Sequence, residues 1–160
     1  MIQAVRETNF IAYLETEAER IDTSVTSAHI RHLMKFTNDL DGAVFYAYAS
    51  VETIHNRYTG LQYVYSAASN VFSGKVNLIP AGHFKYELYE VSWISEDVVL
   101  AAATAPATET DVLPVVNENG VVQGLVAIGI LYLSEKSGSE EVQYTEYDSP
   151  AATNTIYYGQ

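Results

Sequence analysis

Ala-Val-Phe-Tyr-Ala-Tyr-Ala-Ser-Val, residues 43–51, has the composition of a β-strand. It is rich in valine and aromatic residues, which favour strands, and polar residues typical of turns bound it. Tyr46 and Tyr48 are two residues apart, and a second tyrosine pair with the same spacing lies in residues 58–66. Side chains two apart on a strand share one face of the sheet. The two segments therefore predict neighbouring strands of a β-meander.

The segments before residue 43 fit either a strand or a helix. In residues 10–17 and 29–38, apolar side chains recur at four-residue spacing, which is the period of a helix face. A polar, turn-like link at residues 23–27 joins two segments of similar length, and this favours strands. We predict strands here, with an α+β fold that has an N-terminal helix as the alternative. Residues 1–42 also fit an arm appended to the main fold.

Two long apolar runs follow later in the chain. In residues 83–93 the apolar residues change face near Leu88, which a β-bulge or a strand buried on both faces would explain. Residues 125–133 are apolar without alternation, as in a central strand that is covered on both sides. Between these runs, residues 101–111 are small or polar and contain a proline, which predicts an exposed, mobile loop.

Turn signals complete the picture of the fold. The pair Asn119-Gly120 predicts a hairpin formed by residues 112–124. About ten short strands joined by brief turns predict an all-β fold, either an antiparallel β-sandwich or a barrel-like arrangement. We treat residues 1–160 as a single domain, in which residues 149–160 form a terminal strand that can add to the sheet edge of a neighbouring copy.

The composition limits the classes of partner. The chain has 160 residues, a net charge of -12 and no cysteine. The negative charge opposes binding to nucleic acid and to anionic membranes, and without cysteine there are no disulfides or thiolate metal sites. The first 20 residues hold no apolar run of signal-peptide length, and no apolar segment approaches the roughly 20 residues that span a bilayer. We expect a protein that is cytosolic at synthesis, without nucleic-acid or membrane partners.

Patterns of catalytic and metal-binding residues are weak. His29 and His32 are the only close histidine pair, and on a strand they would point to opposite sides. A zinc site also needs a third ligand. There is no serine nucleophile motif and no glycine-rich phosphate loop. We predict no enzyme activity, catalytic residue, metal, cofactor or small-molecule substrate; a small metal hydrolase that uses these two histidines and a carboxylate is the least favoured alternative.

The 13 tyrosines favour a binding surface instead. Such rings bury apolar area while the hydroxyl keeps a hydrogen bond, so they suit contacts between proteins. Rings on strands also stack on sugars, and a carbohydrate-binding β-sandwich that uses Trp93 and tyrosines is an alternative. As contact residues we predict the groups that a simple one-sheet pattern leaves outside: Leu33, Tyr48, Tyr89, Trp93, Tyr157 and Tyr158.

Three segments carry a resemblance to known proteins. They are Phe36-Thr-Asn-Asp-Leu40, residues 80–90 (Pro-Ala-Gly-His-Phe-Lys-Tyr-Glu-Leu-Tyr-Glu), and the end of the chain, with Glu-Val-Gln-Tyr-Thr at 141–145 and Asn-Thr-Ile-Tyr-Tyr-Gly-Gln at 154–160. In these segments the chain resembles small virion structural proteins of tailed bacteriophages, especially marine ones. The resemblance implies a neck or tail protein near the head-tail junction, present in multiple copies, whose partners are copies of itself and other virion proteins. Capsid decoration is the alternative position in the virion.

Overall fold

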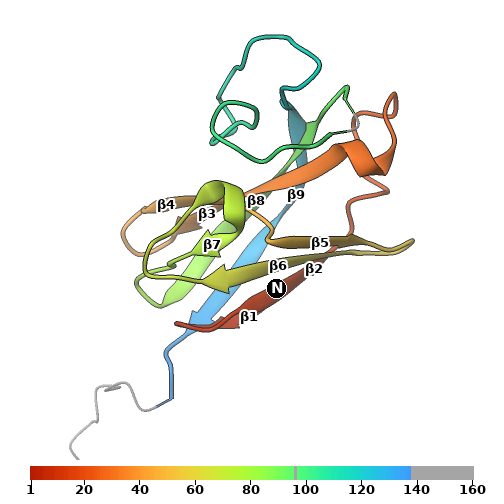
Figure 1. Cartoon of the computed structure of the whole chain (residues 1–160). Helices are drawn as coiled ribbons and strands as arrows, with labels where there is room; N and C mark the ends of the chain where they lie inside the picture. The colour runs from red at the N-terminus through yellow and green to blue at the C-terminus, as the bar shows by residue number, and fades with distance from the viewer. Residues whose placement is uncertain (96, 138–160) are drawn as a thin grey trace, which may run out of the picture.

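The computed structural model describes residues 1–95 and 97–137, which form two β-sheets packed face to face (Figure 1). The first sheet has five strands, the second has three with one short strand beside it, and the sandwich does not close into a barrel. In chain order the elements are β1 (Ile2–Val5), β2 (Phe10–Leu14), the 3-10 turn η1 (Ser27–His29), β3 (Ile30–Asn38), β4 (Val44–Tyr48), β5 (Val51–Ile54), β6 (Thr59–Tyr65), the 3-10 turn η2 (Val71–Ser73), β7 (Lys75–Val76), β8 (Gly82–Ser92) and β9 (Val121–Ser134).

The strand order is β1-β9-β8-β3-β4 in the first sheet and β2-β6-β5 in the second, with β7 paired to β6. The predicted all-β fold is therefore confirmed, and the α+β alternative is wrong, because the described residues contain no α-helix. Two features differ from the prediction. β1 runs parallel to β9 and β7 runs parallel to β6, and β8 and β9 are long strands of 11 and 14 residues. In the described part of the chain, no helix has the length and apolarity needed to cross a membrane.

A core of apolar side chains fills the space between the sheets. Phe10 of β2 stacks on Tyr63 of β6, with 5.1 Å between ring centroids, and both rings meet Phe36 of β3 edge to face. Because β2 and β6 belong to one sheet and β3 to the other, these three rings join the two layers. Aromatic pairs in such geometries add about 0.5–1.5 kcal/mol each beyond the area they bury.

The N-terminal segments are strands, as predicted. In β2, Phe10 and Ala12 are buried while Ile11 and Tyr13 are exposed, which is the alternation of a sheet with one wet face. β3 lies between β4 and β8, β1 pairs with β9, and β2 pairs with β6. The first 42 residues are therefore an integral part of both sheets, and the alternative of an appended arm is wrong.

β8 is covered on both faces, and this explains why its apolar face changes near Leu88. Residues before this point, such as Phe84, face the second sheet, whereas Val91 and Trp93 face the opposite way. The pairing of β8 with β3 is regular, while its register with β9 shifts twice, after Leu88 and after Glu90. At both shifts the extra residue lies on β9, so β8 itself carries no bulge. The explanation by burial on both faces is correct, and the explanation by a bulge in this strand is wrong.

The covering layer is residues 97–120, which we call the covering loop (Figure 1). The prediction of an exposed loop at 101–111 is wrong, because Ala105 and Pro106 are buried against the outer face of the first sheet. The predicted hairpin at 112–124 is also wrong, since none of its residues before β9 forms a strand. Instead, the N–H of Gly120 donates to the carbonyl of Thr104, which closes the loop on itself.

Candidate interaction surface

The outer face of the first sheet, which points away from the second sheet, has a covered half and an open half. The covered half lies under the covering loop and forms a second apolar core. Gly120 passes so close to the ring of Trp93 that a Cβ at this position would lie 2.5 Å from Cζ2. Only glycine leaves room for this approach, so the Asn-Gly pair serves loop packing rather than a hairpin turn.

Three of the predicted contact residues belong to this second core, so their assignment is wrong. Leu33, Tyr48 and Trp93 each have 0% of their surface exposed. Tyr89 is half-buried beside them, and Tyr157 and Tyr158 lie outside the described residues. The prediction assumed that each sheet has one buried face. The covering loop buries part of the second face of the five-stranded sheet as well. The proposed sugar platform loses its main ring for the same reason.

Tyr48 fixes the covering loop with a hydrogen bond. Its hydroxyl donates to the carbonyl oxygen of Pro106 over 2.7 Å, and both residues are buried. Burial raises the pKa of the Tyr48 hydroxyl far above its usual value, so the group stays a neutral donor.

Replacing Tyr48 with phenylalanine tests this bond. The ring still fills its place, but the buried Pro106 carbonyl loses its donor, and we expect a loss of about 1–3 kcal/mol in the free energy of unfolding. Urea denaturation followed by fluorescence measures the change. Tyr132→Phe is a matched control on the open half, where we expect a change within about 0.5 kcal/mol. Equal effects of the two variants would contradict the anchoring role.

A row of charged groups borders the open half. Lys35 of β3 forms ion pairs with Glu109 of the covering loop and with Glu87 of β8, and Lys85 lies 2.9 Å from Glu87. The hydrogen bond from Lys85 lowers the pKa of Glu87, and the bond to Glu109 raises that of Lys35. Burial of Tyr46, which also bonds Glu109, raises its pKa to about 12. The charges satisfy one another, so this row offers no unpaired charge to a ligand.

The open half carries an apolar row on β9 and β1, which we call the β9 stripe. Its side chains are 39% to 56% exposed although they are large and lie on strands of the first sheet. The stripe consists of Leu125, Ile128, Ile130 and Tyr132 of β9 and Val5 of β1. The prediction that residues 125–133 form a strand covered on both sides is therefore wrong for the outer face.

A signal in the sequence could have revealed the stripe. The inward positions of β9 include the small residues Ala127 and Gly129, while the outward positions between and beside them are large. A Cβ at Gly129 would lie 2.5 Å from the hydroxyl of Tyr86, so the inner face has no room for a side chain here. The small residues mark the side of close packing, and the isoleucines must then point outward.

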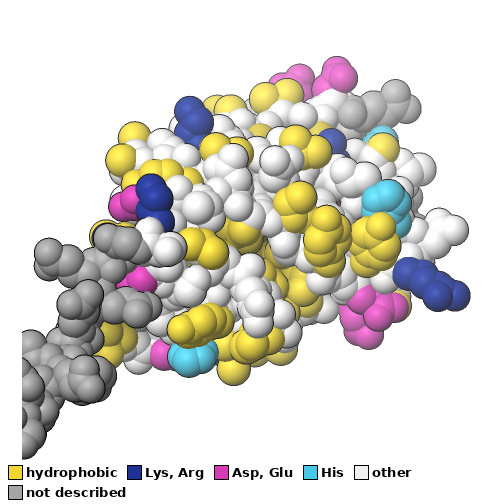
Figure 2. Space-filling model, turned by 90° about the horizontal axis from the view of Figure 1, so that it is seen from below, with side chains coloured by type: hydrophobic (Ala, Val, Ile, Leu, Met, Phe, Trp, Pro, Cys, Tyr) yellow, Lys and Arg dark blue, Asp and Glu magenta, His cyan; other side chains and the backbone are white. Residues whose placement is uncertain are grey.

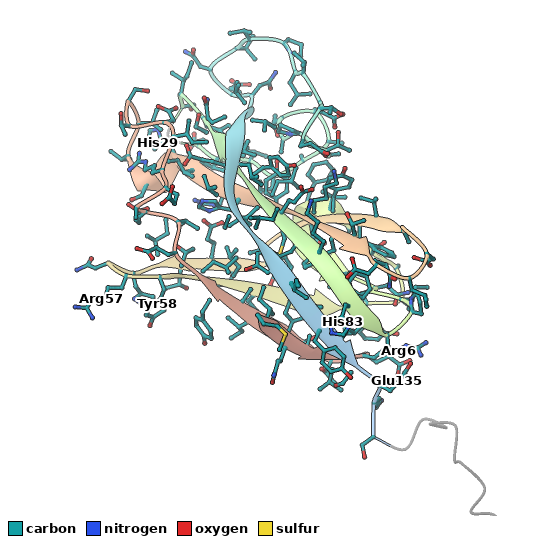
Figure 3. All side chains as sticks on the ribbon, turned by 180° about the vertical axis from the view of Figure 1, so that it is seen from behind. Arg6, His29, Arg57, Tyr58, His83 and Glu135 are labelled. Atoms are coloured by element: carbon teal, nitrogen blue, oxygen red, sulfur yellow. The ribbon has the colours of Figure 1, made fainter. Side chains whose placement is uncertain are left out.

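A groove continues the stripe around the edge of the sheet. It has a volume of about 500 Å³ and is lined by residues of β1, β2 and β9, among them Val5, Phe10 and Tyr132. Seen from below, hydrophobic side chains are exposed in several patches between separate acidic and basic groups (Figure 2). Figure 3 shows the molecule from behind, where β9 runs beside β8 and His83, Arg6 and Glu135 lie near the lower end of these strands. Arg6 forms an ion pair with Glu135. The groove shares Val5 and Tyr132 with the stripe, so the two form one surface.

The buried polar groups inside the sandwich are held by hydrogen bonds within the fold. Nδ1 of His32 lies 2.7 Å from Oε1 of Glu52, and both side chains are almost fully buried. Glu90, opposite His32 on the next strand, accepts hydrogen bonds from the N–H groups of Ile21 and Asp22. Within residues 1–95 and 97–137, no three histidine or acidic side chains come together to hold a metal ion. His32 is paired with Glu52 inside the sandwich, so the metal-hydrolase alternative gains no support.

Comparisons with models of protein families, with curated proteins and with solved structures found no match. The candidate site therefore rests on the geometry of this chain. The geometry points to the β9 stripe, because it is apolar, lies on a rigid sheet and has no cover among the described residues. Contiguous apolar surface of this kind typically marks a contact with another protein.

Proposed function

We propose that the protein is a structural subunit of a tailed-phage virion, present in multiple copies and held in place by its sheet surfaces. The observation that carries this proposal is the β9 stripe, whose large apolar side chains remain exposed on an otherwise well-packed sandwich. When another subunit covers such a surface, the association is stabilised by about 25 cal/mol for each Å² of apolar area removed from water. The chain thus contributes contact area, not chemistry.

The position in the particle follows from the resemblance in sequence. It favours the neck or tail near the head-tail junction, with copies of the chain and other virion proteins as partners, over decoration of the capsid. A net charge of -12 keeps such a subunit soluble before it is assembled and disfavours contact with the packaged nucleic acid. A carbohydrate-binding role has no comparable support, because Trp93 lies under the covering loop.

Analysis of purified particles tests the proposal. In virions of a phage that encodes this chain, we expect quantitative mass spectrometry to find a fixed number of copies, more than one for each particle. The major capsid protein of the same particles provides the internal reference. Imaging of the particles then locates the density of the sandwich. If the chain is abundant in the infected cell but absent from purified particles, the proposal is wrong.

A further inference from the structure

β2 is the end strand of the second sheet, and one of its sides is open. It pairs with β6 from Phe10 to Leu14 in a regular register without a shift. In Figure 1, β2 lies on the opposite side of β6 from β5. Among residues 1–95 and 97–137, no strand pairs with the other side of β2. A strand edge without a partner carries main-chain donors and acceptors that another strand can bind.

The hydrogen bonds of β6 show which main-chain groups of β2 face the open side. The carbonyl of Gln62 accepts from the N–H of Ser50 over 2.8 Å, so the main-chain groups of Gln62 point to β5 and away from β2. Opposite residues of an antiparallel pair face either toward each other or away from each other. Ile11 lies opposite Gln62, so its N–H and carbonyl point away from β6. Two residues further along the strand, the N–H and carbonyl of Tyr13 point to the same open side.

This edge lacks the features by which proteins protect a free strand. Natural edges carry charges, proline or bulges, or are very short. β2, Phe-Ile-Ala-Tyr-Leu, has no charge, proline or glycine. The other edges are protected: β1 has only four residues, β5 carries the inward carboxylate of Glu52, and Phe72 of η2 stacks against β4. β9 also has an open side along residues 121–130, but both register shifts fall in this stretch. β2 is therefore the edge best suited to pairing.

The outward side chains of β2 are large and exposed. Ile11 is 45% exposed and Tyr13 is 63% exposed. The ring of Tyr13 lies over Gly60 of β6, where a Cβ would be 3.5 Å from its Cε1, and it meets the ring of Tyr58 edge to face. These contacts hold the ring in place before any partner binds, so little side-chain freedom is lost on association. Aromatic and β-branched side chains form favourable pairs across neighbouring strands.

We propose that β2 of two copies of this chain pair edge to edge, antiparallel, about a two-fold axis at Ala12. In this register Ile11 of each copy lies opposite Tyr13 of the other, and all the open N–H and carbonyl groups of these residues are hydrogen-bonded. The outer face gains two pairs of isoleucine with tyrosine. On the inner face Ala12 meets its own copy, and its small side chain leaves room for this approach. The second sheets then join in the order β5-β6-β2-β2-β6-β5.

The groove beside β1 receives the end of the partner strand. Asn9 and Phe10 line this groove, and in the proposed register they lie opposite the partner's Glu15 and the partner's Leu14. Oδ1 of Asn9 accepts from a main-chain N–H of β6, so its amide N–H groups are directed elsewhere and can donate to the carboxylate of the partner's Glu15. The two glutamates lie at opposite ends of the pair, about 20 Å apart along the strands and beyond the Debye length of about 8 Å. No like charges therefore oppose each other at this contact.

The size of the contact predicts a weak, reversible dimer. Five paired residues and their flanks place the interface at the low end of known sizes, below about 1,200 Å². We expect a dissociation constant on the order of micromolar. The pair leaves Ile128 and Ile130 of the β9 stripe uncovered, because these residues lie on the outer face of the first sheet. The inference therefore goes beyond the proposed function and concerns a second surface of the same subunit.

The experiment is oxidative cross-linking of two variants mixed in equal amounts, Ile11→Cys and a Tyr13→Cys chain that carries a tag to change its size. The chain has no cysteine, so the introduced thiols report on proximity without background. Cα atoms of opposed, hydrogen-bonded residues in an antiparallel pair lie about 5.5 Å apart, within the range that a disulfide bridges. Residue 11 is offset by two positions from residue 11 of the other copy, so each variant alone should cross-link less. We expect disulfide-linked heterodimers as the main product on a denaturing, non-reducing gel.

Val51→Cys is the matched control in place of Ile11→Cys. Val51 is 53% exposed and lies opposite Gln62, as Ile11 does, so the two residues share the outer face of the second sheet at opposite edges. We expect only traces of heterodimer from Val51→Cys mixed with Tyr13→Cys. Equal cross-linking of the two mixtures, or none with Ile11→Cys, overturns the pairing.

A second pair of variants tests the association without cross-linking. Lysine on an edge strand hinders pairing, so we expect Ile11→Lys to raise the dissociation constant in sedimentation velocity by roughly tenfold or more. Val51→Lys should leave it unchanged, and circular dichroism verifies that both variants keep the fold. Equal effects of the two variants, or a wild-type chain that stays monomeric at roughly 1 mM, also overturn the pairing. Particle composition, measured separately, decides whether the virion role stands, because that role rests on the β9 stripe.

Discussion

Trp93→Ala is expected to lower the free energy of unfolding by about 3–5 kcal/mol, the range observed when a buried large aromatic side chain is deleted. Trp93 has 0% of its surface exposed and lies between the sheet and the covering loop. Its removal leaves a cavity between the sheet and the covering loop. Urea or guanidinium denaturation measures the change. The neighbouring Ile94, which is 63% exposed, provides the control Ile94→Ala, for which we expect a change within about 0.5 kcal/mol.

The contact between Trp93 and Gly120 sharpens this prediction. Gly120→Ala places a methyl group against the indole ring and should cost about 1–3 kcal/mol through overpacking. In the Trp93→Ala background the ring is gone, and the added methyl group should cost much less, because neighbouring substitutions are not additive. Additive effects of the two substitutions would show that the covering loop does not depend on this contact. A small loss of unfolding free energy in Trp93→Ala would likewise show that the covering loop does not depend on this contact.

The second core also shows how far the sequence predicts this fold. Strand periodicity is local, so the strands of both sheets are predictable from alternation and turn residues. The covering loop is not, because its buried residues Ala105 and Pro106 are small, and its larger contacts, Val98 and Leu100, lie outside any strand. Leu33, Tyr48 and Trp93 therefore look like outward groups of a single sheet, although a loop distant in sequence buries them.

The exposed surface is hidden from the sequence for a related reason. A continuous apolar run such as residues 125–133 is compatible with burial on both faces or on one face, and hydrophobicity does not distinguish the two cases. The decision depends on which segment covers the sheet, and here the covering loop reaches only half of the outer face. The open edge of β9 depends on the short length of β1, which is a property of topology rather than of local pattern.

The buried pair of His32 and Glu52 is the least predictable feature of the interior. The two residues are 20 positions apart and belong to different sheets, so no spacing rule connects them. The side chain of Glu52 accepts from Nδ1 of His32 at 2.7 Å and from the main-chain N–H of the same residue at 3.3 Å. This pair replaces apolar packing at one end of the core and links the two layers through hydrogen bonds.

Glu52→Ala is therefore expected to lower the free energy of unfolding by about 3–5 kcal/mol, because it leaves the buried imidazole without its partner. The double variant His32→Leu with Glu52→Leu removes both polar groups and fills their space, and we expect it to recover most of the loss. Denaturation of the two variants in parallel measures the difference. If the double variant is as unstable as Glu52→Ala, packing volume rather than the unpaired histidine sets the cost. If neither variant is destabilised, the two sheets are held together by the three aromatic rings of the main core without help from this pair.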